Sequence, residues 1–166
     1  MRNWVFCVVV TANCWGQALG NWKIIPAKSR QSNGTLAGAI TIKYEGHPRE
    51  AAPKAETWTF YQVRADGTSE TTSQTLRFDG KEYSCGDLGL EEGSDTVVST
   101  KLDARTAEVS YMKSGRVTRR VVRTVSADGN QMTLEIRITP ENGPAAESLM
   151  VFVRWGQAIG NEWSRR

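Results

Sequence analysis

The sequence predicts an all-β protein, a single antiparallel up-and-down barrel of about 8–10 strands. Apolar and polar residues alternate with period two through much of the chain, as in strands with one buried and one solvated face. Asp-Gly pairs separate these segments, and no segment combines an amphipathic helical pattern with caps. At most, residues 26–29 form one helical turn. A meander of hairpins favours a barrel, because closure removes exposed strand edges.

Six segments carry the alternation that predicts strands. They are residues 21–25, 36–45, 56–67, 74–80, 106–112 and 131–139. The apolar residues that share a face within their segment are Ile40, Ile42, Tyr44, Trp58, Phe60, Leu76, Phe78, Ala107, Val109, Tyr111, Met132, Leu134, Ile136 and Ile138. In the segment 56–67, Tyr61 and Val63 take the face opposite to Phe60, and this change of phase predicts a β-bulge near Phe60–Tyr61.

Turn signals separate the predicted strands. Asp66-Gly67, Asp79-Gly80 and Asp128-Gly129 predict hairpin turns, because Asp and Gly tolerate the positive φ that these turns require. Residues 112–116 and 140–143 carry further turn signals. We therefore expect most neighbouring strands to be joined by short hairpins.

The composition is that of one globular domain. Hydrophobic residues make up 39% of the 166-residue chain and charged residues 23%, which excludes disordered and collagen-like classes. The formal net charge is +3, and no basic block is long enough for a nucleic-acid-binding arm. The sequence has no phosphate loop and no spaced cluster of metal ligands, so we expect neither a cofactor nor a metal.

Residues 1–18 carry the pattern of a secretory signal peptide. Arg2 is followed by an apolar run from Trp4 to Ala12, and Gly16 and Ala18 occupy the −3 and −1 positions of a cleavage site. A cut after Gly20 is the second choice. The apolar run is shorter than the roughly 20 residues of a membrane-spanning helix, so no transmembrane span is expected. The alternative is an N-terminal strand of a cytosolic protein.

This prediction divides the chain into three parts and implies a location. Residues 19–155 form the barrel domain, and residues 156–166 form a polar tail. We expect the protein to be secreted or periplasmic. Cleavage leaves Cys85 as the one cysteine, and the one histidine, His47, lies in a predicted loop. A structural thiol is therefore expected, because a catalytic cysteine needs a neighbouring base or positive charge.

Four arginines lie among valines in the segment 116–123. They are Arg116, Arg119, Arg120 and Arg123. The interpretation favoured here is the solvated side of a strand, and the alternative is a phosphate-binding groove. Acidic pairs suited to catalysis are lacking, because Glu91 and Glu92 are adjacent and would point opposite ways on an extended chain. Asp103 and Glu108 are predicted to lie in a turn and on a strand surface.

The segment GNWKIIPAKS, residues 20–29, resembles the opening of a lipocalin-like β-barrel family of secreted bacterial proteins. Further segments match the same pattern in order and spacing. They are residues 52–67, 77–83, 101–136 and 150–154. The similarity covers most of the chain from Gly20 to Arg154. It implies a lipocalin-like barrel and export, and it implies no particular activity, because most members have no assigned ligand.

The resemblance also implies a structural pair at the closed end of the barrel. In lipocalins the Trp of the Gly-x-Trp motif lies there, beneath a basic residue of the last strand. The matching positions are Trp22 and Arg154. A guanidinium over an indole ring contributes about 0.5–2 kcal/mol. The alternative role for Trp22 is ligand contact.

A small barrel either holds one small ligand or fills its interior with side chains. The candidate ligand-binding residues are Trp22, Ile42, Tyr44, Trp58, Phe60, Phe78, Tyr111, Leu134 and Ile136. The alternative interpretation is that these residues form a packed core.

Three functions are compatible with these observations. The first is a carrier of a small, partly apolar ligand, which would be no enzyme. The second is a solid-barrel interaction module that binds a protein or an envelope partner, favoured by apolar residues on both faces of residues 149–155. The third is a barrel isomerase or cyclase, which would require an inward-facing charged group with a perturbed pKa.

Overall fold

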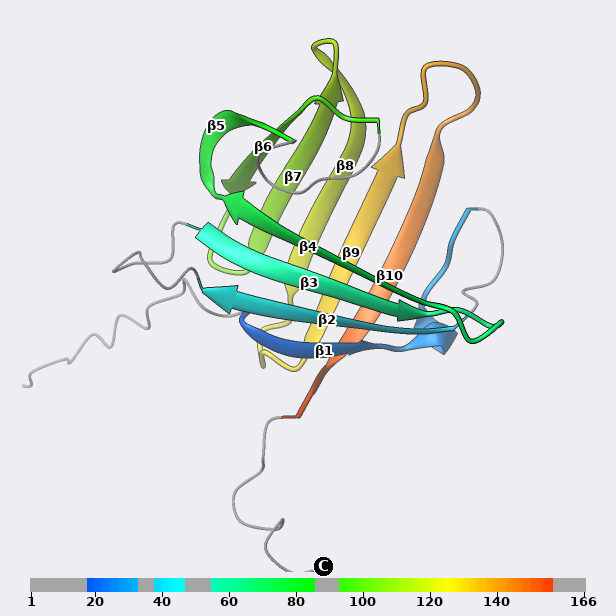
Figure 1. The fold of residues 1–166 in the computed structure, drawn as a ribbon. Helices are drawn as coiled ribbons and strands as arrows, with labels where there is room; N and C mark the ends of the chain where they lie inside the picture. The colour runs from blue at the N-terminus through cyan, green and yellow to red at the C-terminus, as the bar shows by residue number, and fades with distance from the viewer. Residues whose placement is uncertain (1–17, 33–37, 47–54, 86–92, 157–166) are drawn as a thin grey trace, which may run out of the picture.

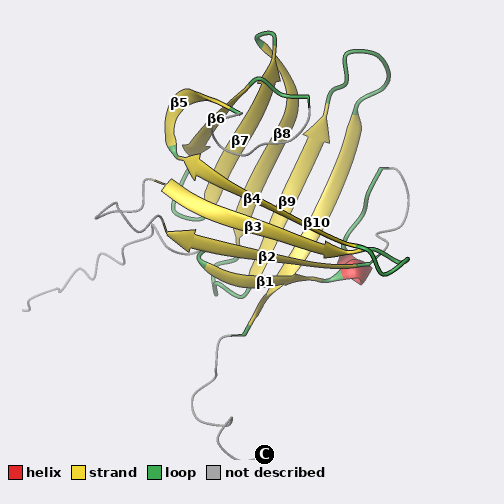
Figure 2. Ribbon diagram, in the orientation of Figure 1, coloured by secondary structure: helices red, strands yellow, loops and turns green. Residues whose placement is uncertain are grey.

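The computed structural model describes residues 18–32, 38–46, 55–85 and 93–156, and most of them belong to strands (Figure 2). The elements are β1 (Gly20–Ile24), the 3-10 turn η2 (Pro26–Lys28), β2 (Ala39–Gly46), β3 (Ala55–Val63), β4 (Ser69–Arg77), β5 (Asp79–Ser84), β6 (Thr96–Lys101), β7 (Thr106–Lys113), β8 (Arg116–Val125), β9 (Gln131–Ile138) and β10 (Ala146–Trp155). The ten strands form one antiparallel sheet in the order β4-β3-β2-β1-β10-β9-β8-β7-β6-β5. The predicted all-β, up-and-down barrel is confirmed.

The sheet folds over on itself into a nearly closed barrel. Figure 1 shows β1–β4 crossing in front of β7–β10 at a steep angle, with the interior between these two halves. The halves are continuous where β1 pairs with β10. The sheet ends at β4 and β5, which follow each other in the chain, and no ladder joins these two strands in the described part of the chain. The barrel therefore has one unpaired seam.

The predicted alternation produces strands with one buried face. In β9, Met132, Leu134 and Ile136 are buried and the intervening Glu135 is exposed. Ile138 does not follow the pattern, because it ends the strand and remains 41% exposed. The turn from β7 to β8 has positive φ at both Ser114 and Gly115, as primed hairpin turns require.

Two local predictions are wrong. Strand β3 pairs with β2 and β4 in unbroken register, so there is no bulge at Phe60–Tyr61, and Tyr61 is simply an exposed apolar residue. Asp79-Gly80 forms no hairpin turn either. Gly80, with a φ of 75°, lies inside β5 at a shift of register against β6. The chain bends between β4 and β5 without pairing them.

The core consists of two clusters. The first lies on the inner faces of β1, β2, β9 and β10 and includes Trp22, Ile42, Tyr44, Leu134, Ile136, Met150 and Phe152. The second surrounds the seam and includes Leu76, Phe78, Cys85, Val97, Ala107, Val109 and Tyr111. Trp58 and Val121 pack against both clusters. The interior between the clusters is where a cavity lies.

The proposed signal segment lies outside the described residues up to position 17, and so does the tail from position 157. Ala18 is described, and it is buried in the first cluster. None of the helical structure in the described ranges is long and apolar enough to cross a membrane.

Candidate ligand-binding cavity

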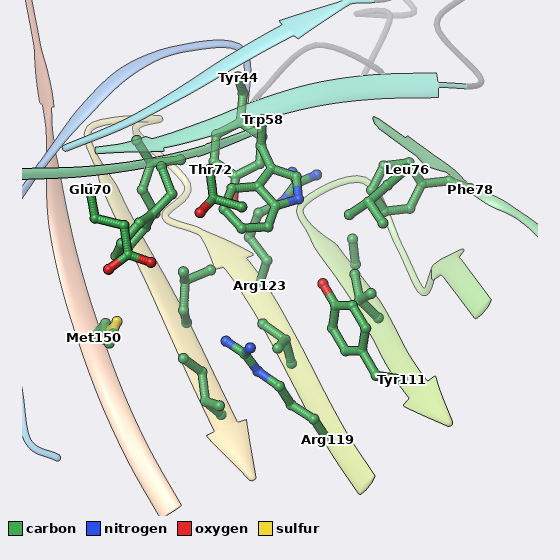
Figure 3. Close-up of a pocket in the computed structure, with 17 residues that line it drawn as sticks. Tyr44, Trp58, Glu70, Thr72, Leu76, Phe78, Tyr111, Arg119, Arg123 and Met150 are labelled. Carbon is green, nitrogen blue, oxygen red and sulfur yellow. The ribbon is translucent and has the colours of Figure 1, made fainter. Parts of the chain in front are cut away.

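A cavity of about 140 Å³ lies inside the barrel between the two core clusters (Figure 3). Strands β2, β3, β4, β7, β8, β9 and β10 all contribute to its wall. Its lining residues are Ile42, Tyr44, Trp58, Phe60, Glu70, Thr72, Leu76, Phe78, Ala107, Val109, Tyr111, Arg119, Val121, Arg123, Leu134, Ile136 and Met150. The wall is mainly apolar and aromatic, with a few polar groups, which is typical of small-molecule sites.

The structure places eight of the nine candidate ligand-binding residues on this wall. They are Ile42, Tyr44, Trp58, Phe60, Phe78, Tyr111, Leu134 and Ile136. Seven of them come together because each has the inward parity of its strand, and the barrel turns every inward face toward one interior. Phe78 continues the inward parity of Leu76 one residue beyond the end of β4. Trp58 and Phe60 meet edge to face, with ring centroids 6.3 Å apart.

Trp22 does not line the cavity. Its ring is 0% exposed, and its indole N–H donates to the Ala18 carbonyl over 2.7 Å. The Arg154 guanidinium carbon lies 4.4 Å from the centroid of the Trp22 ring, and the two residues face each other in the β1–β10 ladder. Arg154 also donates to the carbonyls of Leu19 (2.6 Å) and Gly129 (2.8 Å). Trp22 therefore has the geometry of a structural core residue that packs against Arg154.

The interpretation of the arginine segment as a solvated face is wrong for two of its members. Arg119 and Arg123 lie on the inward face of β8 and line the cavity, whereas Arg116 and Arg120 face outward. Successive residues of a strand point to opposite faces, so Arg119 and Arg123, which are four positions apart, share the inward face. Arg123 shares the inward face with Val121, and that shared parity was the available signal in the sequence.

Arg123 is stabilised in the interior by a buried carboxylate. It is 7% exposed, and its Nη1 lies 2.7 Å from the Glu56 carboxylate, which is 1% exposed. Lys101 Nζ lies 2.9 Å from the other oxygen of Glu56. The Arg123 guanidinium also lies over two rings, 4.7 Å from the Tyr44 centroid and 5.4 Å from that of Phe78. These residues form a buried ionic cluster beside the cavity.

The ionic cluster changes the acidity of its members. Burial raises the pKa of the Glu56 carboxyl, but the charges and hydrogen bonds of Arg123 and Lys101 outweigh burial and hold that pKa below its ordinary value. Burial also raises the pKa of the Tyr44 phenol, and the nearby Arg123 offsets this only in part. At neutral pH the cluster therefore holds an ionised Glu56 and a neutral Tyr44.

Glu56 was not recognised from the sequence, although it shares the inward parity of Trp58 and Phe60 in β3. A second polar contact crosses the interior from β4 to β7, where the Tyr111 hydroxyl donates to Gln74 Oε1 over 3.0 Å. Gln74 is buried as well. Polar groups on inward faces interrupt the apolar pattern, so the alternation alone could not identify Glu56 and Gln74 as inward-facing residues.

The remaining chemical candidates lie away from the cavity. The Asp103 carboxylate accepts hydrogen bonds from the backbone of Arg105 and Thr106 in the β6–β7 turn. Glu108 faces outward and pairs with Arg120. Cys85 is buried in the second cluster. His47, Glu91 and Glu92 lie outside the described residues. Within the described ranges, no three acidic, Cys or His side chains gather as metal ligands would.

Comparison with solved structures identifies the fold. No family model matches the chain, and no curated protein matches it in sequence. Zebrafish ileal bile acid-binding protein, complexed with cholic acid, is 8% identical with a TM-score of 0.50, over 83% of this chain and 98% of that one. The S-type phycobiliprotein lyase of Guillardia theta is 11% identical with a TM-score of 0.51, over 84% of this chain and 89% of that one. The chain is thus similar to lipocalin-like and fatty-acid-binding-protein-like barrels in fold.

Proposed function

We propose that this barrel is a carrier that binds one small, partly apolar molecule in its interior and catalyses no reaction. The observation that carries the proposal is the cavity of about 140 Å³, lined by aromatic and aliphatic side chains with a few polar groups. A packed core would leave no such space, because protein interiors are normally close-packed. The zebrafish barrel supports the idea by analogy, since it is a bile acid-binding protein complexed with cholic acid.

The proposal includes export, with the protein secreted or periplasmic and related to the lipocalin-like barrels of secreted bacterial proteins. Its support is the signal-peptide pattern of residues 1–18 and the matching segments from Gly20 to Arg154. The mass of the protein recovered from the exported fraction of its host tests this part. A chain that begins at Leu19 supports export, and a chain that retains Met1 contradicts it.

Binding in the cavity is tested with a pair of matched variants. Val121 lines the cavity, and Val122 is the next residue of β8 and faces outward. We expect fluorobenzene to bind the wild type and the Val122→Phe variant in fluorine NMR titrations, and to lose binding in Val121→Phe, whose ring fills the space. Equal binding by both variants would place the probe outside the barrel. A wild type that binds neither fluorobenzene nor a polar derivative of it would contradict a carrier function.

A further inference from the structure

The polar groups around the cavity contain more hydrogen-bond donors than acceptors. Arg123 Nε and Gln74 Nε2 are buried donors for which the described chain supplies no acceptor. Arg123 is 7% and Gln74 2% exposed. Arg123 lines the cavity directly, and Gln74 is joined to the cavity wall through Tyr111. A buried donor without an acceptor is costly, so a native protein normally satisfies it with water or with a bound group.

The charged side chains that line the cavity are mainly positive. Arg119 and Arg123 both project from β8 into the cavity, and the Arg119 guanidinium carbon lies 5.5 Å from the centroid of the Tyr111 ring. Figure 3 shows the Arg119 guanidinium and the Tyr111 hydroxyl pointing from neighbouring strands toward the strands opposite. Among the described lining residues, the one carboxylate is Glu70, which is exposed and pairs with Arg64.

This arrangement favours an anion. Guanidinium groups bind carboxylates through charge-assisted hydrogen bonds, and these bonds are stronger in a water-poor interior than at the surface. The Tyr111 hydroxyl is a further polar group beside Arg119. A neutral ligand of the same shape would gain the apolar contacts but would form no charge-assisted hydrogen bond with the arginines of the wall.

The size of the cavity limits the apolar part of the ligand. An apolar cavity of about 150 Å³ accepts benzene, and the cavity in this barrel measures about 140 Å³. Trp58, Phe60 and Phe78 supply aromatic surfaces within it. A single ring fits this space and these surfaces, because aromatic rings pair with one another in offset or edge-to-face contacts.

We propose that the ligand is a small aromatic carboxylate of about one ring, with its ring among Trp58, Phe60 and Phe78 and its carboxylate on the inner face of β8 beside Arg119. The proposal rests on the carrier function and adds to it the charge and the size of the ligand. Arg119 is a binding residue in this arrangement, and Arg123, which is held by Glu56, adds to the positive potential from deeper in the barrel.

The experiment compares two probes that differ in charge and hardly in shape. Binding of para-fluorophenylacetate and of its neutral analogue para-fluorophenylacetamide is measured by fluorine NMR titration at neutral pH and low salt. We expect the acid to bind at least about tenfold more tightly than the amide, since hydrogen bonds to charged groups contribute that factor or more.

Two variants then assign the preference to the cavity wall. Arg119→Met removes the inward charge, and the neighbouring Arg120→Met removes the same charge from the outer face, where Arg120 pairs with Glu108. We expect Arg119→Met to lose most of the preference for the acid while still binding the amide, which shows that the barrel remains folded. Arg120→Met should keep the wild-type preference within about twofold.

The outcomes separate this inference from the carrier function. Equal affinity for acid and amide would overturn the anionic ligand and leave the carrier function standing. Binding of fluorobenzene with neither of the two longer probes would overturn the size and the charge of the proposed ligand, again with the carrier function intact. A full preference for the acid in Arg119→Met would overturn the role of Arg119. Failure of all three probes would remove both proposals together.

Discussion

At the scale of single residues, the pair formed by Glu56 and Arg123 links β3 to β8 through the interior of the barrel. Both side chains are buried, and they lie 67 positions apart in the sequence. Removing one partner of such a pair leaves a buried charge without compensation, whereas removing both partners can cost little. Lys101, at 2.9 Å from Glu56, moderates this cost for the carboxylate but offers nothing to Arg123.

A double-mutant cycle tests this coupling. We expect Glu56→Gln to destabilise the protein by about 3–5 kcal/mol, because it removes the charge opposite Arg123. Arg123→Met should cost somewhat less, since Lys101 remains beside Glu56. The double variant should be more stable than the sum of the two losses predicts, by at least about 1 kcal/mol. Urea unfolding of the four proteins measures these values, and additive losses would show that the two groups are not coupled.

At the scale of elements, the junction of β1 with β10 decides whether the two halves of the sheet stay together. Four residue pairs form this ladder, from Asn21 opposite Trp155 to Ile24 opposite Phe152. Arg154 extends the junction beyond the ladder, because its guanidinium binds the Leu19 and Gly129 carbonyls and covers the Trp22 ring. One side chain thus joins β1, β10 and the turn between β8 and β9.

Replacement of Arg154 by lysine tests this role. A lysine keeps the charge but cannot reproduce two directed hydrogen bonds and a planar contact with Trp22 at once. We expect Arg154→Lys to lower the free energy of unfolding by about 1–3 kcal/mol. The control is Arg137→Lys on β9, where the side chain is exposed and should change stability by less than about 0.5 kcal/mol. Equal values for the two variants in thermal or urea unfolding would argue against a closing role for Arg154.

At the scale of the whole molecule, Glu56 links stability to pH. Its pKa is held below the ordinary value in the folded state, so the folded protein binds fewer protons than the unfolded chain at mildly acidic pH. The stabilisation is fully present above the unfolded value of about 4.3 and is lost as the pH falls through the lower, folded pKa. Acid should therefore weaken the barrel from its interior.

The difference in the free energy of unfolding between the wild type and Glu56→Gln measures this effect. We expect it to be constant near neutral pH and to shrink progressively below a pH of about 4.3. The control is Glu147→Gln, measured at the same pH values, because it makes the same substitution at an exposed carboxylate. Denaturant titrations at a series of pH values provide both curves. A difference for Glu56→Gln that grows in acid would contradict the stated direction of the pKa shift.

The barrel and most of its cavity wall could be predicted because period two reports the face of each residue directly. Ile42, Tyr44 and Leu134 needed no partner to be identified as inward-facing. The pattern failed where a polar residue faces inward, since its partner comes from a distant strand. Strand β6 was not predicted for this reason. Its inward Ser99 is buried and donates to the Arg77 carbonyl over 2.7 Å, which breaks the apolar alternation.

The inward arginines show the same limit. The charge of Arg123 favours the surface until Glu56 is known to lie beside it, and nothing in a 67-residue separation indicates that contact. The seam between β4 and β5 was also unpredictable from local signals. Asp79-Gly80 is a good hairpin dipeptide, but after Phe78 the chain enters β5, which pairs with β6 and not with β4.

The pairing of β1 with β10 also sets the order of events during folding. Residues near position 20 must find partners near position 155, so the ladder joins the first strand of the barrel to the last. Contacts of such separation form slowly, because a long loop must close before they contribute. A nascent chain can assemble hairpins such as β7–β8 early, but it cannot bury Trp22 beneath Arg154 until β10 has been synthesised. The burial of that indole is therefore a late event, and the change in Trp22 fluorescence would report the time of barrel closure.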